Sequence, residues 1–281
     1  MDILLEHLAF PESPRWYDGR LWLADWGAGE ALTVDAAGRR EIVAALPSFP
    51  SCLDFLTDGR LLLVDADRGR LLAVGPEGPV QHADLSELSE HPWNEVVVDA
   101  QDRAYVDNIG FAFPDGEPGD PAPGTIALVG PDGAARTVAE GLMFPNGMAL
   151  TPDGGTLLVA ESYASRISAF TVAPDGGLGT RRTWADLGDG VPDGICLDAT
   201  GALWYADVPH RRAVRVAAGG EVLARIELDR GCFSCALGGP DGRTLFLVAN
   251  RWGEEAAEPA GRVLTVRVPV AGADPDRRRT R

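Results

Sequence analysis

The chain lacks the features that mark membrane, nucleic-acid-binding and secreted proteins. None of its 281 residues belongs to an apolar run near the roughly 18 residues of a membrane span. The start, Met1 to His7, has neither the basic residues nor the long apolar core of a signal peptide. Lys and Arg total 25 against 42 Asp and Glu, a net charge of -17, so no basic stripe is available for phosphates. These absences predict a cytoplasmic protein that binds neither membranes nor nucleic acid.

Cysteine is scarce too, with four residues in the chain. In a reducing compartment we expect them to carry free thiols. Cys232 and Cys235 have the spacing of a redox or half-zinc motif, but no second such pair exists, so we favour packing over redox chemistry. A Gly-x-Ser-x-Gly nucleophile elbow is also missing, and no serine or cysteine nucleophile is expected.

The chain contains one sequence repeat that occurs six times. It consists of an apolar run, a tight turn usually built on Asp-Gly, and a second apolar run that ends on an acid or amide; the first copy spans Ser13 to Asp25. The copies recur at intervals of roughly 40 to 50 residues, the period of propeller blades. Helical periodicity is absent apart from a short turn expected at Leu85 to Leu88. The turn markers are Gly19, Gly59, Asp102, Gly154, Gly201 and Gly242.

This repeat predicts an all-β fold, a six-bladed β-propeller with four short strands in each blade. The last blade has only three strands after Ser234, and Asp2 to Leu8 has no partner of its own. We therefore expect this N-terminal strand to close the ring. The propeller is predicted as a single domain over 1–270, followed by a frayed, solvated basic tail over 271–281. Nothing in the sequence specifies an oligomeric state.

Polar residues stand at the start of the innermost predicted strands, which would ring one end of the central channel. Two carboxylates and two amides facing one point would repel one another or lie unsatisfied unless a cation sat between them. Ligation by oxygen alone favours calcium, magnesium or manganese. The alternative is a polar lining that binds channel water. The six positions are Glu12, Ser51, Asn94, Asn146, Asp193 and Ser234.

Three motifs carry a family resemblance: Pro-Glu-Ser-Pro-Arg-Trp at 11–16, Pro-Asn-Gly at 145–147 and Pro-Asp-Gly at 192–194. In this order they resemble the gluconolactonase family that includes senescence marker protein 30 and luciferin-regenerating enzyme. The resemblance implies one divalent metal in the channel, calcium before magnesium, manganese or zinc. It also implies hydrolysis of a small-molecule lactone or ester. The implied metal ligands are Glu12, Asn146, Asp193 and Asn94.

Blade three departs from the family pattern. Sugar-lactone members carry Arg-x-Asn-Asp-Gly where this chain has Pro-Trp-Asn-Glu-Val at 92–96, without the arginine. In relatives, the residue matching Asn94 contacts either the metal through water or the substrate. Loss of the guanidinium removes a donor for polyols, which favours a less polar lactone or ester over a sugar lactone.

In the implied mechanism the metal polarises the lactone carbonyl and activates a water, with Asp193 as the candidate general base. Loops on the same face are expected to contact substrate. The longest, Gly110 to Gly124, is either a lid or an ordinary surface insertion. His91 and His210 are placed there as proton shuttles or as exposed residues without a role. The candidate substrate contacts are Asn94, Trp93, His91, Phe111 and Tyr163.

Second strands end on the same face in an outer polar ring, expected to orient the ligands or cap strand ends. Further aromatic residues near this face could wall an apolar pocket, whereas Trp16, Trp22 and Trp204 are assigned to the core. The outer ring consists of Asp25, Asp65, Asn108, Glu161, Asp207 and Asn250. The further aromatic residues are Trp26, Phe144 and Trp252.

Two other functions fit parts of this pattern. The four oxygen ligands also resemble the calcium site of diisopropylfluorophosphatase-like phosphotriesterases, which would act on phosphotriesters in place of lactones. A propeller can also be a non-catalytic platform for ligands or proteins. Such a platform would pair an exposed patch with an incomplete ring of ligands. The complete ring favours an enzyme, a hydrolase of the lactonase and esterase type (EC 3.1.1-like).

Overall fold

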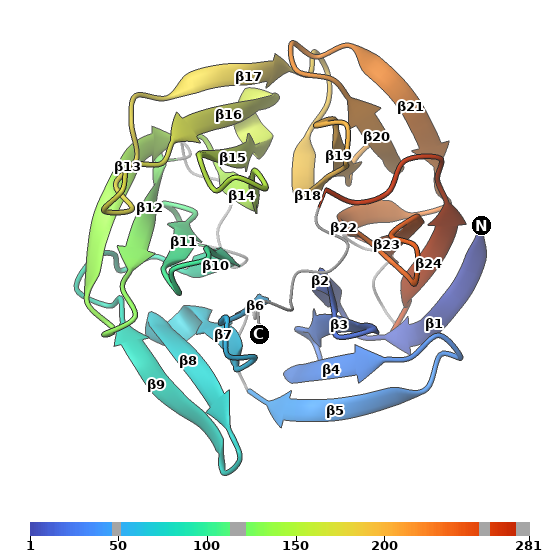
Figure 1. The fold of residues 1–281 in the computed structure, drawn as a ribbon. Coiled ribbons are helices and arrows are strands. Elements are labelled where there is room, and N and C mark those ends of the chain that lie inside the picture. The colour runs from blue at the N-terminus through green and yellow to red at the C-terminus, as the bar shows by residue number, and fades with distance from the viewer. Residues whose placement is uncertain (47–51, 113–121, 253–258, 274–281) are drawn as a thin grey trace.

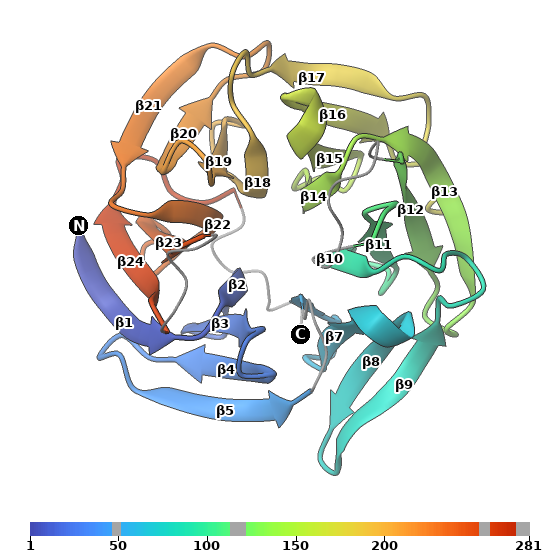
Figure 2. The same ribbon diagram turned by 180° about the vertical axis from the view of Figure 1, so that it is seen from behind.

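Six four-stranded antiparallel sheets surround a common centre in the computed structural model, which describes residues 1–46, 52–112, 122–252 and 259–273 (Figure 1). The first five sheets each use four strands that are consecutive in sequence. Figure 2 shows the same ring from behind, with the sheets following one another around the centre in chain order. The prediction of an all-β, six-bladed propeller is confirmed.

The strands have the following bounds, blade by blade. Blade one holds β2 (Pro11–Tyr17), β3 (Arg20–Asp25), β4 (Glu30–Val34) and β5 (Arg40–Ala45). Blade two holds β6 (Leu53–Phe55), β7 (Leu61–Asp65), β8 (Arg70–Gly75) and β9 (Gly78–Asp84), and blade three holds β10 (Trp93–Val98), β11 (Ala104–Asn108), β12 (Gly124–Val129) and β13 (Ala135–Leu142). Blade four holds β14 (Pro145–Leu150), β15 (Thr156–Glu161), β16 (Arg166–Thr171) and β17 (Arg182–Asp186), and blade five holds β18 (Pro192–Leu197), β19 (Leu203–Asp207), β20 (Arg212–Val216) and β21 (Val222–Glu227). Blade six holds β22 (Gly231–Gly238), β23 (Thr244–Asn250), β24 (Gly261–Arg267) and β1 (Asp2–Leu8).

The N-terminal strand closes the ring as predicted. β1 pairs antiparallel with β24, from Asp2 opposite Thr265 to Leu8 opposite Gly261. This pairing covers the edge of β24 and gives the last blade four strands like the other five.

The C-terminal segment also packs on the ring. The Gly272 N–H donates to the Gly242 carbonyl at 2.9 Å, and the Ala273 N–H donates to the Leu197 carbonyl at 3.0 Å. The packed chain therefore extends past the predicted boundary at residue 270. The rest of the predicted tail, 274–281, lies outside the described residues.

A shared backbone conformation explains the sequence repeat. All six turn markers have positive φ, between 58° at Asp102 and 94° at Gly59. Glycine adopts this left-handed conformation without a steric penalty, and aspartate tolerates it better than most residues. Asp102 has a second role, since its carboxylate accepts hydrogen bonds from the Thr57 backbone N–H at 2.6 Å and the Thr57 hydroxyl at 2.8 Å. The one marker that is not glycine thus also ties blade three to blade two.

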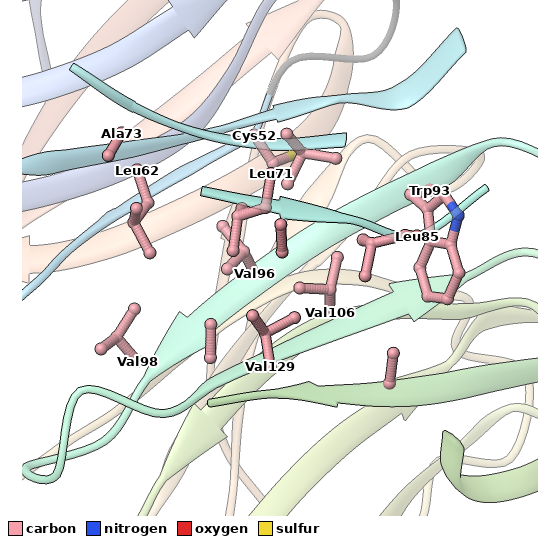
Figure 3. Close-up of a cluster of buried hydrophobic side chains, with 14 of the residues drawn as sticks. Cys52, Leu62, Leu71, Ala73, Leu85, Trp93, Val96, Val98, Val106 and Val129 are labelled. Carbon is pink, nitrogen blue, oxygen red and sulfur yellow. The ribbon is translucent and has the colours of Figure 1, made fainter. Parts of the chain in front are cut away.

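The core lies between adjacent blades, where apolar side chains of facing strands meet. In Figure 3, Val96, Val106 and Val129 of blade three pack with Leu62 and Leu71 of blade two. Alternating residues of each strand point to the two faces of its sheet, so every blade packs against both neighbours. Among the described residues, no helix has the length and apolar character needed to cross a membrane.

Smaller predictions about packing also hold. The turn at Leu85 to Leu88 is present, because the Leu88 N–H donates to the Leu85 carbonyl at 3.0 Å. Trp204 is buried, and Trp16 and Trp22 pack against buried clusters, as expected of core residues.

Candidate functional site

The four predicted ligands all lie where inner strands begin, and each lies beside a break in the strand pairing. These strand starts pair with the ends of the second strands, as Pro145 does with Glu161 and Pro192 with Asp207. Both sets of ends therefore lie on one face of the ring, as expected. A β-bulge bends the strand and redirects the side chains next to it. The breaks fall between Glu12 and Arg15, Trp93 and Val96, Pro145 and Met148, and Pro192 and Ile195.

Two glycines let neighbouring inner strands touch at this level. A Cβ on Gly147 would lie 2.6 Å from the Asp193 carbonyl oxygen, and a Cβ on Gly194 would lie 2.0 Å from Ser234 Oγ. Only glycine fits such an approach of one backbone to another. The glycines of the Pro-Asn-Gly and Pro-Asp-Gly motifs are therefore required by packing around the axis, and they bring Asn146 and Asp193 into neighbouring positions.

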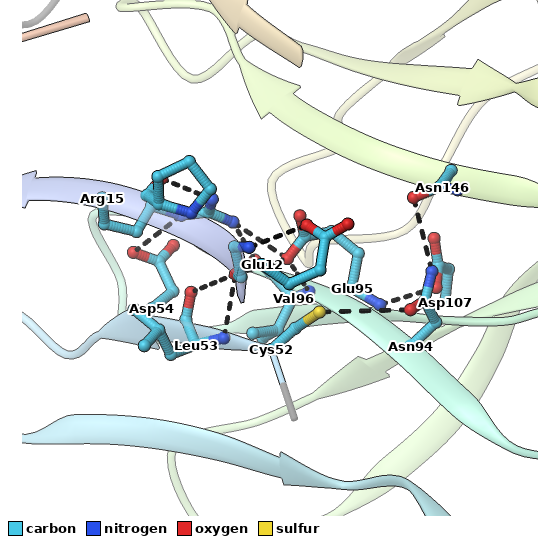
Figure 4. Close-up of polar contacts among 12 residues, drawn as sticks. Glu12, Arg15, Cys52, Leu53, Asp54, Asn94, Glu95, Val96, Asp107 and Asn146 are labelled. Carbon is cyan, nitrogen blue, oxygen red and sulfur yellow. Dashed lines mark hydrogen bonds and ion pairs between the residues drawn. The ribbon is translucent and has the colours of Figure 1, made fainter. Parts of the chain in front are cut away.

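The predicted ligands come together in this structure. Asn94 Nδ2 donates to Asn146 Oδ1 at 3.5 Å (Figure 4), and Asn146 is in turn hydrogen-bonded to Asp193. Glu12 interacts electrostatically with Asp193. The side chains of Glu12 and Asn94 are buried, whereas Asn146 and Asp193 are half-buried. Two carboxylates and two amides thus converge from blades one, three, four and five.

The two carboxylates are held together at an electrostatic cost. Burial, followed by repulsion from Asp193, raises the pKa of Glu12 well above its ordinary value. Burial and then repulsion from Glu95 raise the pKa of Asp193, while the hydrogen bond from Asn146 partly opposes the rise. Since each shift reports that the charged form is disfavoured, a bound cation would relieve both.

An acidic layer next to the ligands was missed by the sequence analysis. Arg15 Nη2 donates to Glu95 Oε1 at 3.0 Å, the Ser13 hydroxyl donates to the same oxygen at 3.1 Å, and the Glu95 N–H donates to Asp107 at 2.9 Å (Figure 4). Burial raises the pKa of Asp107 well above its ordinary value. The sequence sign of this acidic layer was Glu95, an acidic residue followed by three valines in a strand that is buried throughout.

Three side chains of the outer polar ring hydrogen-bond the backbone just before a predicted ligand. This is the orienting role expected of that ring. Each bonds the chain just before Glu12, Asn94 or Asn146, so the backbone of each ligand is fixed from its own blade. The contacts are Phe10 N–H to Asp25 at 2.6 Å, Asn108 Nδ2 to the Pro92 carbonyl at 3.0 Å, and Met143 N–H to Glu161 at 2.9 Å.

The fourth ligand, Asp193, is held from the neighbouring blade. The buried Ser162 hydroxyl donates to the Pro192 carbonyl at 2.7 Å. We expect Ser162→Ala to lower the free energy of unfolding by about 1 kcal/mol, the value of one such bond. At the calcium site expected from the sequence, the affinity for calcium should fall by about 10-fold, because the backbone beside Asp193 is released. Chemical denaturation and calorimetry measure the two effects.

A matched control is Ser86→Ala, which removes a hydroxyl bonded to Asp84 at 2.6 Å on the exposed surface. It should leave calcium affinity unchanged. Equal losses of calcium affinity in Ser162→Ala and Ser86→Ala would show that Ser162 does not position Asp193.

Two groups of aromatic side chains lie beside the ligands. In the first, Phe10 stacks on Trp26 with ring centres 5.0 Å apart and meets Phe233 at 4.9 Å and Trp252 at 5.9 Å. Phe10 lies two residues before Glu12. The ring of Trp252 is half exposed, so this group offers apolar surface next to the site.

The second group contains two of the predicted substrate contacts. Phe111 stacks on Tyr163 with ring centres 6.0 Å apart, and Phe144 meets Tyr163 at 4.8 Å and Phe111 at 5.2 Å. Phe144 lies two residues before Asn146, and Tyr163 is 47% exposed. An apolar surface therefore also borders the site on the side of blade four.

The other predicted loop contacts are placed differently. Trp93 is fully buried between blades two and three, so its side chain has no surface to offer a substrate. His91 is half-buried, and its backbone N–H donates to Ser89 Oγ at 3.0 Å. His210 Nδ1 lies 2.8 Å from Asp207 Oδ1, so the imidazole is hydrogen-bonded to the Asp207 carboxylate. Residues 113–121 of the predicted lid lie outside the described residues.

Within the described ranges, no group of three or more His, Cys, Asp and Glu side chains has the geometry of a metal site. A metal centre here therefore depends on the amides of Asn94 and Asn146 together with the two carboxylates. This donor set of oxygens alone fits a hard divalent cation, and the raised pKa values of Glu12 and Asp193 fit it as well.

The fold and these side chains define a class of protein: a six-bladed propeller in which oxygen-bearing side chains converge at the starts of its inner strands. Comparison with family models is more specific, since the model described as SMP-30/gluconolactonase/LRE-like region matches residues 10–251. The chain belongs to this family.

Individual relatives support the assignment. The chain is 28% identical to a 6-deoxy-6-sulfogluconolactonase of Pseudomonas putida over 90% of this chain and 88% of the relative. A solved luciferin-regenerating enzyme superposes with a TM-score of 0.83 over 96% of both chains at 16% identity. A calcium-binding protein, regucalcin, from Agrobacterium tumefaciens superposes with a TM-score of 0.78 over 98% of this chain and 95% of that one at 21% identity. The two superpositions establish the shared fold.

Proposed function

We propose that the protein is a metal-dependent hydrolase that opens lactones. The observation that carries the proposal is the convergence of Glu12, Asn94, Asn146 and Asp193, with two carboxylates whose pKa values are raised by burial and by repulsion from neighbouring acids. Family membership over residues 10–251 and the similarity to a lactonase over 90% of the chain support the reaction class.

The same four side chains would hold the cation, with calcium as the first ion to test because the ligands are all hard oxygens. When bound, a divalent cation polarises a carbonyl oxygen and lowers the pKa of water. Glu12 and Asp193 supply the negative charge that retains it, and the amides of Asn94 and Asn146 complete the set. Phe10, Phe144 and their aromatic neighbours exclude water from the sides of the site.

Asp193 is the proposed general base. The Asn146 amide interacts with this carboxyl group, and a carboxylate has further lone pairs that can accept a proton from the attacking water. On ring opening, the proton passes from the water through Asp193 to the leaving alkoxide.

The proposed substrates are lactones with an apolar substituent. Two aromatic groups border the ligands, and Pro92 stands where sugar-lactone members carry an arginine. We expect an alkyl-substituted γ- or δ-lactone to have a higher kcat/KM than gluconolactone at the same saturating metal concentration. A preference for gluconolactone would overturn the proposed substrate class and leave the reaction class intact.

Removal of metal should make stability depend on pH in a defined direction. Glu12 and Asp193 have raised pKa values in the folded state, so protonation favours folding and deprotonation opposes it. Their contribution is present below about pH 4 and lost as pH rises through the raised values. The stabilisation by calcium, measured as the difference in Tm with and without the ion, should therefore grow with pH over this window. A difference that stays constant with pH would contradict the site.

A further inference from the structure

Two cysteines that are distant in sequence meet at the inner strands of blades five and six. Cys196 of β18 and Cys235 of β22 place their sulfur atoms 3.6 Å apart. Cys232, which shares the Cys-x-x-Cys spacing with Cys235, contacts the Ser234 carbonyl at 3.9 Å. Cys235 therefore lies next to Cys196 of blade five, a neighbour that the Cys-x-x-Cys spacing does not indicate.

Both sulfur-bearing residues line a cavity of about 130 Å³ at the axis. Its walls come from the second halves of the inner strands, including Val97, Leu150 and Leu237, so it lies farther along the channel than the candidate ligands at the strand starts. Cys196 is half-buried, whereas the other three cysteines are buried. A small oxidant in this cavity would meet Cys196 first, with Cys235 directly behind it.

We propose that Cys196 and Cys235 are a peroxide-sensitive thiol pair that forms a reversible disulfide. The Cys196 thiol gives up its proton, and the resulting thiolate attacks a peroxide oxygen. The O–O bond breaks, Cys196 becomes a sulfenic acid, and the leaving hydroxide takes up the released proton as water. The Cys235 sulfur then attacks the Cys196 sulfur and displaces hydroxide, which takes up the Cys235 proton as a second water. Overall, two thiols lose two electrons and one hydrogen peroxide gains them. A dithiol reverses the bond by exchange.

The packing allows this bond. A disulfide needs its sulfur atoms about 2.05 Å apart, so the present separation closes by side-chain rotation and a small strand shift. β18 and β22 already touch, because a Cβ on Gly194 would lie 2.0 Å from Ser234 Oγ. The bond would close a loop between residues that are 39 positions apart and covalently join blade five to blade six. Restricting the unfolded chain in this way raises stability.

The test treats the full chain, with all four cysteines, with equimolar hydrogen peroxide and maps disulfides by mass spectrometry of unreduced peptides. We expect one Cys196–Cys235 cross-link, reversal by dithiothreitol, and a rise in Tm of about 5 °C in the oxidised form. Cys196→Ser should abolish both changes. The matched control Cys232→Ser removes the other half of the Cys-x-x-Cys motif and should form the same cross-link as the unmodified protein.

Three results would overturn the proposal: a Cys232–Cys235 cross-link, oxidation of Cys196 to a sulfinic acid without a cross-link, or no reaction at either residue. Peptide mapping of the unsubstituted protein decides among these even if a serine variant fails to fold. The measurement requires neither metal nor substrate, so it stands or falls independently of lactone hydrolysis.

Discussion

Asp193→Asn is expected to lower lactone turnover by about 100-fold or more at saturating calcium. Asparagine keeps the size and an oxygen donor, but it cannot take a proton from water, and general-base catalysis is worth about 10²- to 10⁴-fold. Calcium affinity should fall as well, because one of two negative charges at the site is lost. Steady-state kinetics over a calcium titration separates the two effects, since weaker binding is overcome by more calcium and loss of the base is not.

The matched control for this charge removal is Asp153→Asn, which makes the same substitution in the exposed Asp-Gly turn of blade four. Its turnover and calcium affinity should stay unchanged. Full turnover of Asp193→Asn at saturating calcium would rule out the general-base role and leave Asp193 as a ligand.

Gly194→Ala is expected to destabilise the ring by about 3 kcal/mol or more, at the upper end of the cost of overpacking. The new Cβ would lie 2.0 Å from Ser234 Oγ and 2.7 Å from Ser234 Cα, so backbone has to move as well as a side chain. The shift would separate blades five and six next to Asp193 and weaken calcium binding too. Urea denaturation measures the loss.

Gly75→Ala is the comparison for this substitution. Its Cβ would meet one atom within 4 Å, the Gly78 carbonyl oxygen at 3.8 Å, which is an ordinary contact. Its stability should change little. If Gly194→Ala were as stable as Gly75→Ala, β18 and β22 could not be in the close contact that the structure shows beside Asp193.

The propeller was predictable because its signals are local and repeated. Each blade has a turn residue with positive φ, which can be recognised in the sequence. This conformation favours Gly, as at Gly19, and is occasionally adopted by Asp, as at Asp102. The convergence of Glu12, Asn94, Asn146 and Asp193 was also predictable, because equivalent positions of equivalent strands in a ring must face the axis.

The rest depended on contacts between residues far apart in the chain. Arg15 bonds Glu95 80 positions away, and Cys235 meets Cys196 rather than its near neighbour Cys232. Trp93 was expected near substrate but is fully buried, since the bulge between Trp93 and Val96 decides which way each side chain of that strand points. The sequence alone does not show where the strand pairing shifts, so it does not show which way the Trp93 side chain points.

Metal-dependent opening of lactones is tested most directly by a pH-indicator assay of a lactone panel on chelator-stripped protein, before and after calcium, magnesium, manganese or zinc is returned. We expect stripping to abolish turnover and a divalent ion to restore it in the unsubstituted protein. Full turnover of the stripped protein would contradict the metal-dependent mechanism. A failure to open any lactone with any of these ions would contradict the reaction class, and phosphotriesters would then be the next substrates to try.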